Sequence, residues 1–210
     1  MKQPQHVSFD LDGTLIDSFP VMRAAWENVC REFSLAIPFE QYRLYIGVPF
    51  EVIMSKLGLS ESCDDIKKVY FDYTQRYASD IAVFDGQSKL FSRLRDNNIS
   101  ISIITSKPRA NAQHLIEKFD FDVDFLICGN DFAVGKPHPR PMDELLKNLD
   151  IERHTVVYIG DMLSDLQFAV NSNVEFIFFS GGEYSDINDL VLNPRRVATS
   201  LKDLAVLLNV

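Results

Sequence analysis

Five short runs of β-branched, aromatic and other apolar residues divide the chain, and they constrain its fold more than any other sequence feature. They occupy residues 6–9, 99–105, 123–129, 155–160 and 174–180. Most are continuously apolar rather than alternating with polar residues, which is typical of strands buried on both faces of a parallel sheet. Helical patterns beginning at Arg109, Arg140 and Ser164 separate the last four runs. This alternation predicts an α/β fold with a doubly wound, Rossmann-like parallel sheet.

The interval between the first and second runs breaks this rhythm. It holds roughly 90 residues, far more than one crossover helix needs. Helical patterns fill it at residues 20–33, 38–46, 49–58 and 64–81. We therefore predict a four-helix cap domain at residues 18–82, inserted into a catalytic core formed by residues 1–17 and 83–210. An insert that leaves and re-enters a sheet at neighbouring points can hinge over it as a lid.

Composition narrows the classes of partner. The net charge of −9 argues against a protein that binds the phosphate backbone of nucleic acid, which would carry a basic face. The three cysteines are widely spaced and form no C-x-x-C motif, which indicates reduced thiols in a cytoplasmic protein. Neither a signal peptide nor a membrane-spanning run is visible. The sequence leaves open whether the protein is a monomer or a homodimer.

Acidic, hydroxyl and basic residues follow the predicted strands, where ligands bind in open α/β sheets. In chain order they are Asp10 and Asp12, Thr105 and Ser106, Lys136, and Asp161 and Asp165. Asp10 and Asp12 are two residues apart in extended chain, so both can face one pocket. Gly13 then permits a sharp turn of the backbone.

A cluster of carboxylates with one lysine needs a compensating cation, and Mg²⁺ suits oxygen ligands and substrate phosphate. The metal ion and Lys136 would attract a phosphoryl group, and the Thr105 hydroxyl could help to bind it. A carboxylate nucleophile would form an aspartyl-phosphate, and a second carboxyl could transfer protons to the leaving oxygen and from water. Asp10 and Asp12 suit these two roles.

These motifs resemble those of haloacid dehalogenase superfamily hydrolases of the phosphoglycolate-phosphatase-like subfamily with a helical, C1-type cap. The resemblance covers essentially the whole chain. The motif D-x-D-G-T is residues 10–14, the strand that ends in threonine is 101–105, the lysine motif is "GKPHP", and G-D-x-x-x-D is 160–165. The order and spacing of the four motifs agree with the family.

The resemblance implies a role for each matched residue. Asp10 would be the nucleophile and Asp12 the general acid and base. Mg²⁺ would bind the Asp10 carboxylate, the Asp12 backbone carbonyl and Asp161, and Asp165 would support the metal or Lys136. The residues expected to bind phosphate are Thr105, Ser106, Lys136 and Gly13. The implied activity is Mg²⁺-dependent hydrolysis of a small phosphorylated metabolite in the cytoplasm.

Several alternatives stay open at this point. A sugar phosphomutase would share all four motifs, and a non-catalytic binding or regulatory protein could use the same scaffold. A dehalogenase is disfavoured because Asp12 supplies an acid and base that such enzymes generally lack. Residues 45–51 form either a simple interhelical turn or a loop that reaches the phosphate site. The substrate could be phosphoglycolate, a sugar phosphate, a nucleotide or pyrophosphate.

Overall fold

A six-stranded parallel sheet forms the centre of the protein. The computed structural model describes residues 3–182 and 196–210. The strands are β1 (His6–Phe9), β4 (Ser100–Ile104), β5 (Phe125–Ile127), β6 (Val156–Gly160), β7 (Glu175–Phe179) and β8 (Val197–Ala198). Their order is β5-β4-β1-β6-β7-β8, and every neighbouring pair is parallel. This sheet confirms the predicted doubly wound α/β fold and adds β8, which was not predicted.

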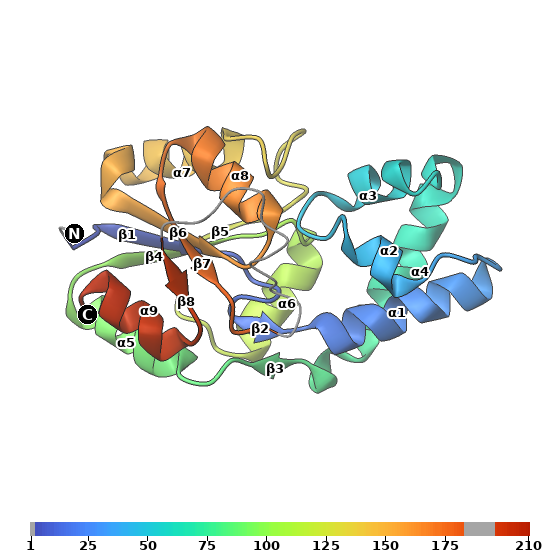
Figure 1. Cartoon of the computed structure of the whole chain (residues 1–210), viewed down its shortest axis with the longest axis horizontal. Helices are drawn as coiled ribbons and strands as arrows, with labels where there is room; N and C mark the ends of the chain where they lie inside the picture. The colour runs from blue at the N-terminus through green and yellow to red at the C-terminus, as the bar shows by residue number, and fades with distance from the viewer. Residues whose placement is uncertain (1–2, 183–195) are drawn as a thin grey trace.

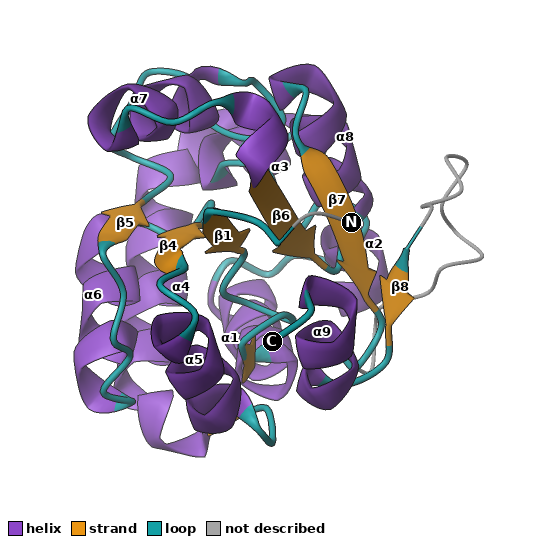
Figure 2. Cartoon of the chain, turned by 90° about the vertical axis from the view of Figure 1, so that its left-hand side faces the viewer, coloured by secondary structure: helices purple, strands orange, loops and turns teal. Residues whose placement is uncertain are grey.

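Helices cover both faces of the sheet, as Figure 2 shows. One face carries α7 (Arg140–Leu149) and α8 (Leu163–Ser172), and the other carries α5 (Gln87–Asp96), α6 (Arg109–Lys118) and α9 (Leu201–Leu208). Because successive side chains of a strand point to opposite faces, β6 contributes side chains to the apolar packing on both faces of the sheet. Val157 and Ile159 pack with the α5 side, whereas Val156 and Tyr158 pack with the α7 side. The continuous apolar runs in the sequence arise from this double burial.

The segment between β1 and α5 is largely helical and lies beside the sheet (Figure 1). It contains α1 (Phe19–Glu32), α2 (Phe39–Arg43), α3 (Phe50–Lys56) and α4 (Cys63–Arg76). Short 3-10 turns occur at Ser60–Ser62 and Ala78–Asp80, and a third follows α7 at Arg153–Thr155. A separate apolar cluster holds these helices together, and within it the rings of Trp26 and Tyr42 stack at 4.3 Å between centroids. The domain boundaries at 17/18 and 82/83 stay predictions.

Two very short strands join the helical segment to the rest of the chain. Strand β2 (Ile16–Asp17) pairs with β3 (Ala82–Val83) in antiparallel fashion. The chain segments that lead into and out of the helical segment therefore lie side by side. Asp17 belongs to this ribbon, and Ser18 directly precedes α1. The ribbon was not predicted, because two residues are too few to show a periodicity.

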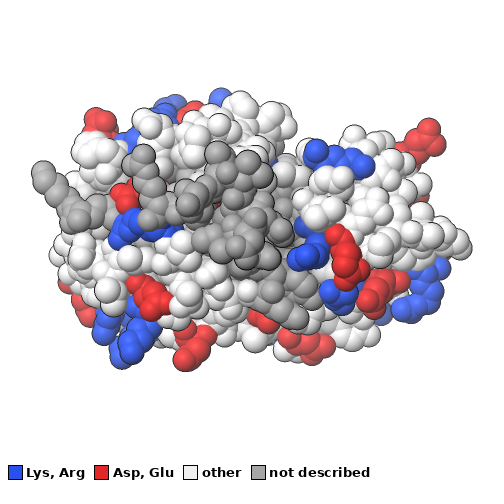
Figure 3. All heavy atoms as spheres, in the orientation of Figure 1, with Lys and Arg blue, Asp and Glu red and all other residues white. Residues whose placement is uncertain are grey.

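Acidic and basic side chains are interspersed on the face shown in Figure 3, with no large patch of one sign among its described residues. Within the described ranges, no helix is both long enough and apolar enough to cross a membrane.

Candidate active site

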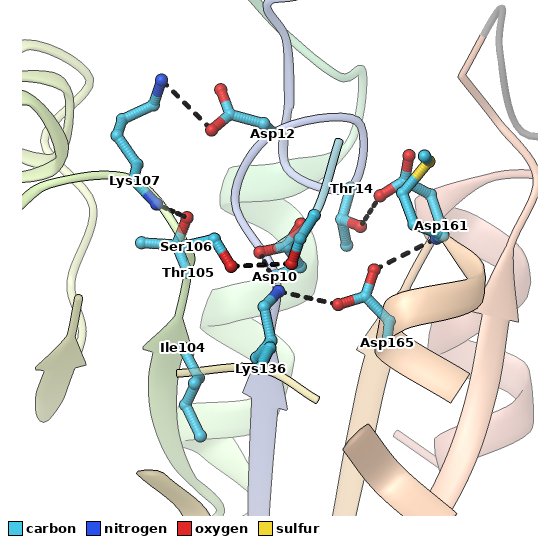
Figure 4. A network of polar contacts seen from close by, with 12 residues as sticks. Asp10, Asp12, Thr14, Ile104, Thr105, Ser106, Lys107, Lys136, Asp161 and Asp165 are labelled. Carbon is cyan, nitrogen blue, oxygen red and sulfur yellow. Dashed lines mark hydrogen bonds and ion pairs between the residues drawn. The ribbon is translucent and has the colours of Figure 1, made fainter. Parts of the chain in front are cut away.

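The predicted site residues meet at the carboxyl-terminal edge of the sheet (Figure 4). Asp10 directly follows β1, Thr105 follows β4 and Asp161 follows β6, while Lys136 lies in the loop between β5 and α7. Parallel strands end on the same edge, so residues far apart in the sequence converge there. Asp10, Thr105, Lys136 and Asp161 are all buried.

Lys136 lies at the centre of a buried polar network. Its Nζ donates to Oδ1 of Asp10 at 2.8 Å, to Oδ1 of Asp165 at 2.7 Å and to the Tyr158 hydroxyl at 3.0 Å. All three N–H donors of the ammonium group are thus used. Burial alone would lower the pKa of Lys136, but the two carboxylates raise it above its usual value, so the lysine stays charged. Burial raises the pKa of Asp10 to about 7, while Lys136 opposes that rise.

Three carboxylates form a compact acidic group suited to a cation. Oxygen atoms of Asp10, Asp161 and Asp165 all lie within 4.8 Å of one another. Oδ2 of Asp161 is buried and accepts no hydrogen bond within the described ranges. Burial, followed by the charges of Asp165 and Asp10, raises the pKa of Asp161 well above its usual value. A buried carboxylate oxygen without a donor is expected where a hard cation binds, so these residues fit Mg²⁺.

The turn after β1 is fitted closely to Asp161. Gly13 has a φ of +83°, and a Cβ atom placed on it would lie 2.2 Å from Oδ2 of Asp161. The next residue, Thr14, donates from Oγ1 to Oδ1 of Asp161 at 3.0 Å. Glycine is therefore required both by the backbone conformation and by the approach of the carboxylate. Gly13 shapes the acidic group, and its predicted role in binding phosphate stays a prediction.

Asp12 has a different environment from the acidic group. Its Oδ2 lies 3.2 Å from Nζ of Lys107, and its Oδ1 accepts from Oγ of Ser18 at 2.5 Å. It also lines a cavity together with Asp10. Asp10 thus lies among potential cation ligands, whereas Asp12 lies beside the Ser18 hydroxyl and the Lys107 ammonium group. The separation suits two carboxyl groups with different chemical roles.

Thr105 and Ser106 both line the same cavity. Oγ1 of Thr105 accepts from the backbone N–H of Lys107 at 3.2 Å. Oγ of Ser106 donates instead to the carbonyl of Gly47 at 2.7 Å, which ties the loop between α2 and α3 to the core. The loop at residues 45–51 therefore reaches the site. The phosphate contacts expected of Thr105 and Ser106 stay predictions.

Two residues of this network were not among the predicted site residues. Lys107 follows Ser106 directly in "TSKP" and is only 8% exposed. Tyr158 lies within β6, and its hydroxyl donates to Oδ1 of Asp165 at 2.9 Å. The sequence offers a weak signal for Lys107, a lysine at a strand end. It offers none for Tyr158, which has the appearance of an ordinary apolar strand residue.

The sheet order, the helical insert and the acid–lysine network together form a candidate active site at the strand ends. Residues 7–179 match the family described as Haloacid dehalogenase-like hydrolase. The chain belongs to this family.

Curated relatives align over most of the chain. A phosphoglycolate phosphatase of Rhodobacter capsulatus is 29% identical over 184 residues, which cover 83% of both chains. A phosphorylated carbohydrates phosphatase of Thermotoga maritima is 24% identical over 190 residues, covering 87% of both. The crystal structure of a hydrolase from Pseudomonas syringae superposes with a TM-score of 0.89 at 23% identity, covering 98% of both chains. That likeness shows the shared fold.

Proposed function

We propose that this protein is a Mg²⁺-dependent phosphatase that hydrolyses a small phosphate monoester through an aspartyl-phosphate intermediate. The observation that carries the proposal is the contact of the buried Asp10 carboxylate with Lys136, at a cavity that Asp12 also lines. The relatives named above as phosphatases support the same reaction class. We assign catalytic roles to Asp10, Asp12 and Lys136.

In the first step, an oxygen of the Asp10 carboxylate attacks the phosphorus atom of the substrate. The bond between phosphorus and the ester oxygen breaks, and the Asp12 carboxyl gives its proton to that leaving oxygen. Lys136 remains charged beside Asp10 and offsets the negative charge of the transferring group. Thr105 and Ser106 supply hydroxyl groups at the wall of the cavity. The products of this step are the alcohol and the phosphorylated enzyme.

In the second step, the Asp12 carboxylate takes a proton from a water molecule, and the oxygen of that water attacks the phosphorus atom. The bond between phosphorus and the Asp10 oxygen breaks, which restores the carboxylate and releases orthophosphate. Lys107 and Ser18 hold the two Asp12 oxygens from separate sides, so the same carboxyl is oriented for both proton transfers. This arrangement assigns positioning roles to Lys107 and Ser18.

Mg²⁺ would be held by Asp10, Asp161 and the Asp12 backbone carbonyl. Asp165 would support the site through Lys136, since its Oδ1 accepts from that lysine and its Oδ2 accepts from the Met162 N–H at 3.1 Å. When bound, the cation neutralises part of the negative charge of the transferring phosphoryl group. The unpartnered oxygen of Asp161 supports this assignment.

We further propose that residues 18–82 act as a cap that selects the organic part of the substrate. The β2–β3 ribbon supplies a hinge, and the contact between Gly47 and Ser106 closes the cap on the core. Closure would exclude bulk water from the phosphoryl group. The three free cysteines agree with the proposed cytoplasmic setting.

The test is orthophosphate release from a panel of phosphorylated metabolites with Mg²⁺, with a chelator, and after Mg²⁺ is restored. We expect release that the chelator abolishes and Mg²⁺ recovers. Asp10→Asn should abolish turnover while the fold is retained, because an amide is a poor nucleophile. Asp17→Asn is the matched control and should retain turnover, since Asp17 lies in the hinge ribbon. Full activity in Asp10→Asn would disprove the mechanism, and transfer from a bisphosphate without orthophosphate release would instead indicate a mutase.

A further inference from the structure

The cavity beside Asp10 and Asp12 limits what the leaving group can be. Its volume is about 50 Å³, and the cap contributes a mainly apolar wall that includes Met22, Ile46 and Phe50. A space of this size beside the two carboxyl groups favours a compact organic group. Apart from the hydroxyl groups of Tyr42 and Tyr70, this wall offers few hydrogen-bond partners for the several hydroxyl groups of a sugar.

Lys107 places a positive charge at this cavity. It lines the cavity, and its side chain is only 6% exposed. An ammonium group has three N–H donors. Within the part of the chain that the structure describes, its ion-pair partner is Oδ2 of Asp12 at 3.2 Å. A buried ammonium with one carboxylate contact retains donors that a second anion can accept, and the cavity is the space that such an anion could enter.

Tyr70 places an unused hydroxyl group in the same cavity wall. The residue is 2% exposed and lines the cavity from α4. Its hydroxyl oxygen is buried and makes no hydrogen bond of good geometry within the described ranges. The neighbouring Tyr42 side chain interacts with this hydroxyl electrostatically and through a weak hydrogen bond, which does not meet the geometry of a full one. Buried hydroxyl groups are normally paired, so an unpaired one at a cavity indicates a group that a ligand completes.

We infer that Lys107 and Tyr70 form a subsite for a second anionic group of the substrate, a carboxylate or a further phosphoryl group, only a few bonds from the esterified oxygen. The inference rests on the proposed phosphatase function and deepens it. It narrows the phosphate monoesters to compact phosphorylated acids, and it adds the phosphoanhydride pyrophosphate as a possible substrate. Lys107 supplies the charge and Tyr70 a neutral donor, and the apolar cap wall disfavours polyhydroxylated groups.

The alternative role for Lys107 is to orient Asp12 alone. That role would affect the protonation of every leaving group, so its loss would slow all substrates alike. If Lys107 also belongs to the subsite, its loss should slow substrates that carry the second anion more than those that lack it. The ratio of kcat/KM between two matched substrates therefore separates the two roles.

The experiment compares 2-phosphoglycolate with 2-hydroxyethyl phosphate, which have similar lengths. The first carries a carboxylate where the second carries a hydroxymethyl group. A second pair, pyrophosphate and methyl phosphate, tests a phosphoryl group as the second anion. Orthophosphate release is measured with Mg²⁺ for the unsubstituted protein and for Lys107→Met and Tyr70→Phe. Lys68→Met and Tyr77→Phe are matched controls, because both residues are exposed.

We expect the unsubstituted protein to prefer the anionic member of one or both pairs by about tenfold or more, as sites built for a charged group do. The pair that shows the preference identifies the second anion as carboxylate or phosphoryl. Lys107→Met should remove most of the preference, and Tyr70→Phe should reduce it several-fold, whereas the controls should keep it. If Lys107→Met does not fold, Tyr70→Phe carries the test because it deletes a single oxygen atom.

Three results overturn the inference in different ways. If the unsubstituted protein hydrolyses both members of each pair equally well, or if neither Lys107→Met nor Tyr70→Phe changes the ratio, the subsite is wrong while the phosphatase function stands. If the folded protein with Mg²⁺ releases orthophosphate from none of the four compounds but does so from other members of the metabolite panel, the subsite is also wrong while the phosphatase function stands. If it releases none from any compound of the panel, the proposed function fails and the subsite fails with it.

Discussion

His6 provides a quantitative test of the packing beneath the active site. Its ring is fully buried in β1, with Nδ1 2.6 Å from Oγ of Ser100 and Nε2 2.8 Å from Oγ of Ser102. Burial lowers the pKa of His6 from 6.5 to about 4, with Asp124 opposing the change and Arg95 adding to it. The imidazole is therefore neutral in the folded protein across most of the acidic range. In the unfolded chain it protonates near its ordinary pKa.

The size of the effect follows from linkage. The unfolded state binds a proton below pH 6.5 and the folded state does so only near pH 4, so acid stabilises the unfolded chain between these values. At about 1.4 kcal/mol for each pKa unit, the free energy of unfolding should fall by about 3 kcal/mol through this group. The loss begins as the pH drops through 6.5 and levels off once both states are protonated, below about pH 4.

The assay is urea unfolding at a series of pH values between about 7 and 4, for the unsubstituted protein and for His6→Gln. Glutamine does not titrate, so the difference in stability between the two proteins should shift by about 3 kcal/mol in favour of the variant as the pH falls. His114→Gln is the control, because it makes the same exchange at an exposed histidine. Parallel pH profiles for the unsubstituted protein and His6→Gln would refute the reasoning.

Two further substitutions test the geometry of the site. Gly13→Ala should lower kcat/KM by at least about a hundredfold, because its Cβ would displace Asp161, whose Oδ2 lies 2.2 Å from that position. Gly58→Ala also has a positive φ, but no atom lies within 4 Å of its Cβ position, so a similar loss there would refute the steric explanation. Tyr158→Phe removes the hydroxyl bonded to Lys136 and should lower kcat by about tenfold with KM little changed. An unchanged kcat would exclude a positioning role for Tyr158.

The sequence was most informative where burial and chemistry impose strong patterns. The predicted strands were recognisable because both faces of the sheet are covered, as the alternation of Val157 and Tyr158 between two apolar clusters shows. The convergence of Asp10, Lys136 and Asp161 followed from a general property of parallel sheets, since their strands end on one edge. The family resemblance then matched the residues that the structure brings together.

The remaining features depend on tertiary contacts that local patterns do not encode. The pairing of β2 with β3 involves two residues on each side, so it leaves no periodicity to detect. The prediction for Ser106 could not foresee that its hydroxyl donates to the carbonyl of Gly47, which lies in the loop between α2 and α3. Lys107 and Tyr70 line one cavity although they lie in different parts of the chain, which no spacing in the sequence indicates.

The central claim is that Asp10 becomes phosphorylated, and trapping of the phosphorylated enzyme tests it most directly. Acetyl phosphate has a leaving group that needs no proton, so Asp12→Asn should be phosphorylated by it with Mg²⁺ but should lose the phosphoryl group slowly. Borohydride reduces an aspartyl-phosphate to homoserine, which peptide mass spectrometry locates. We expect a burst of about one acetate for each enzyme molecule and homoserine at position 10. An acetate burst with homoserine at another position, or with none, would contradict the assignment of Asp10 as the nucleophile.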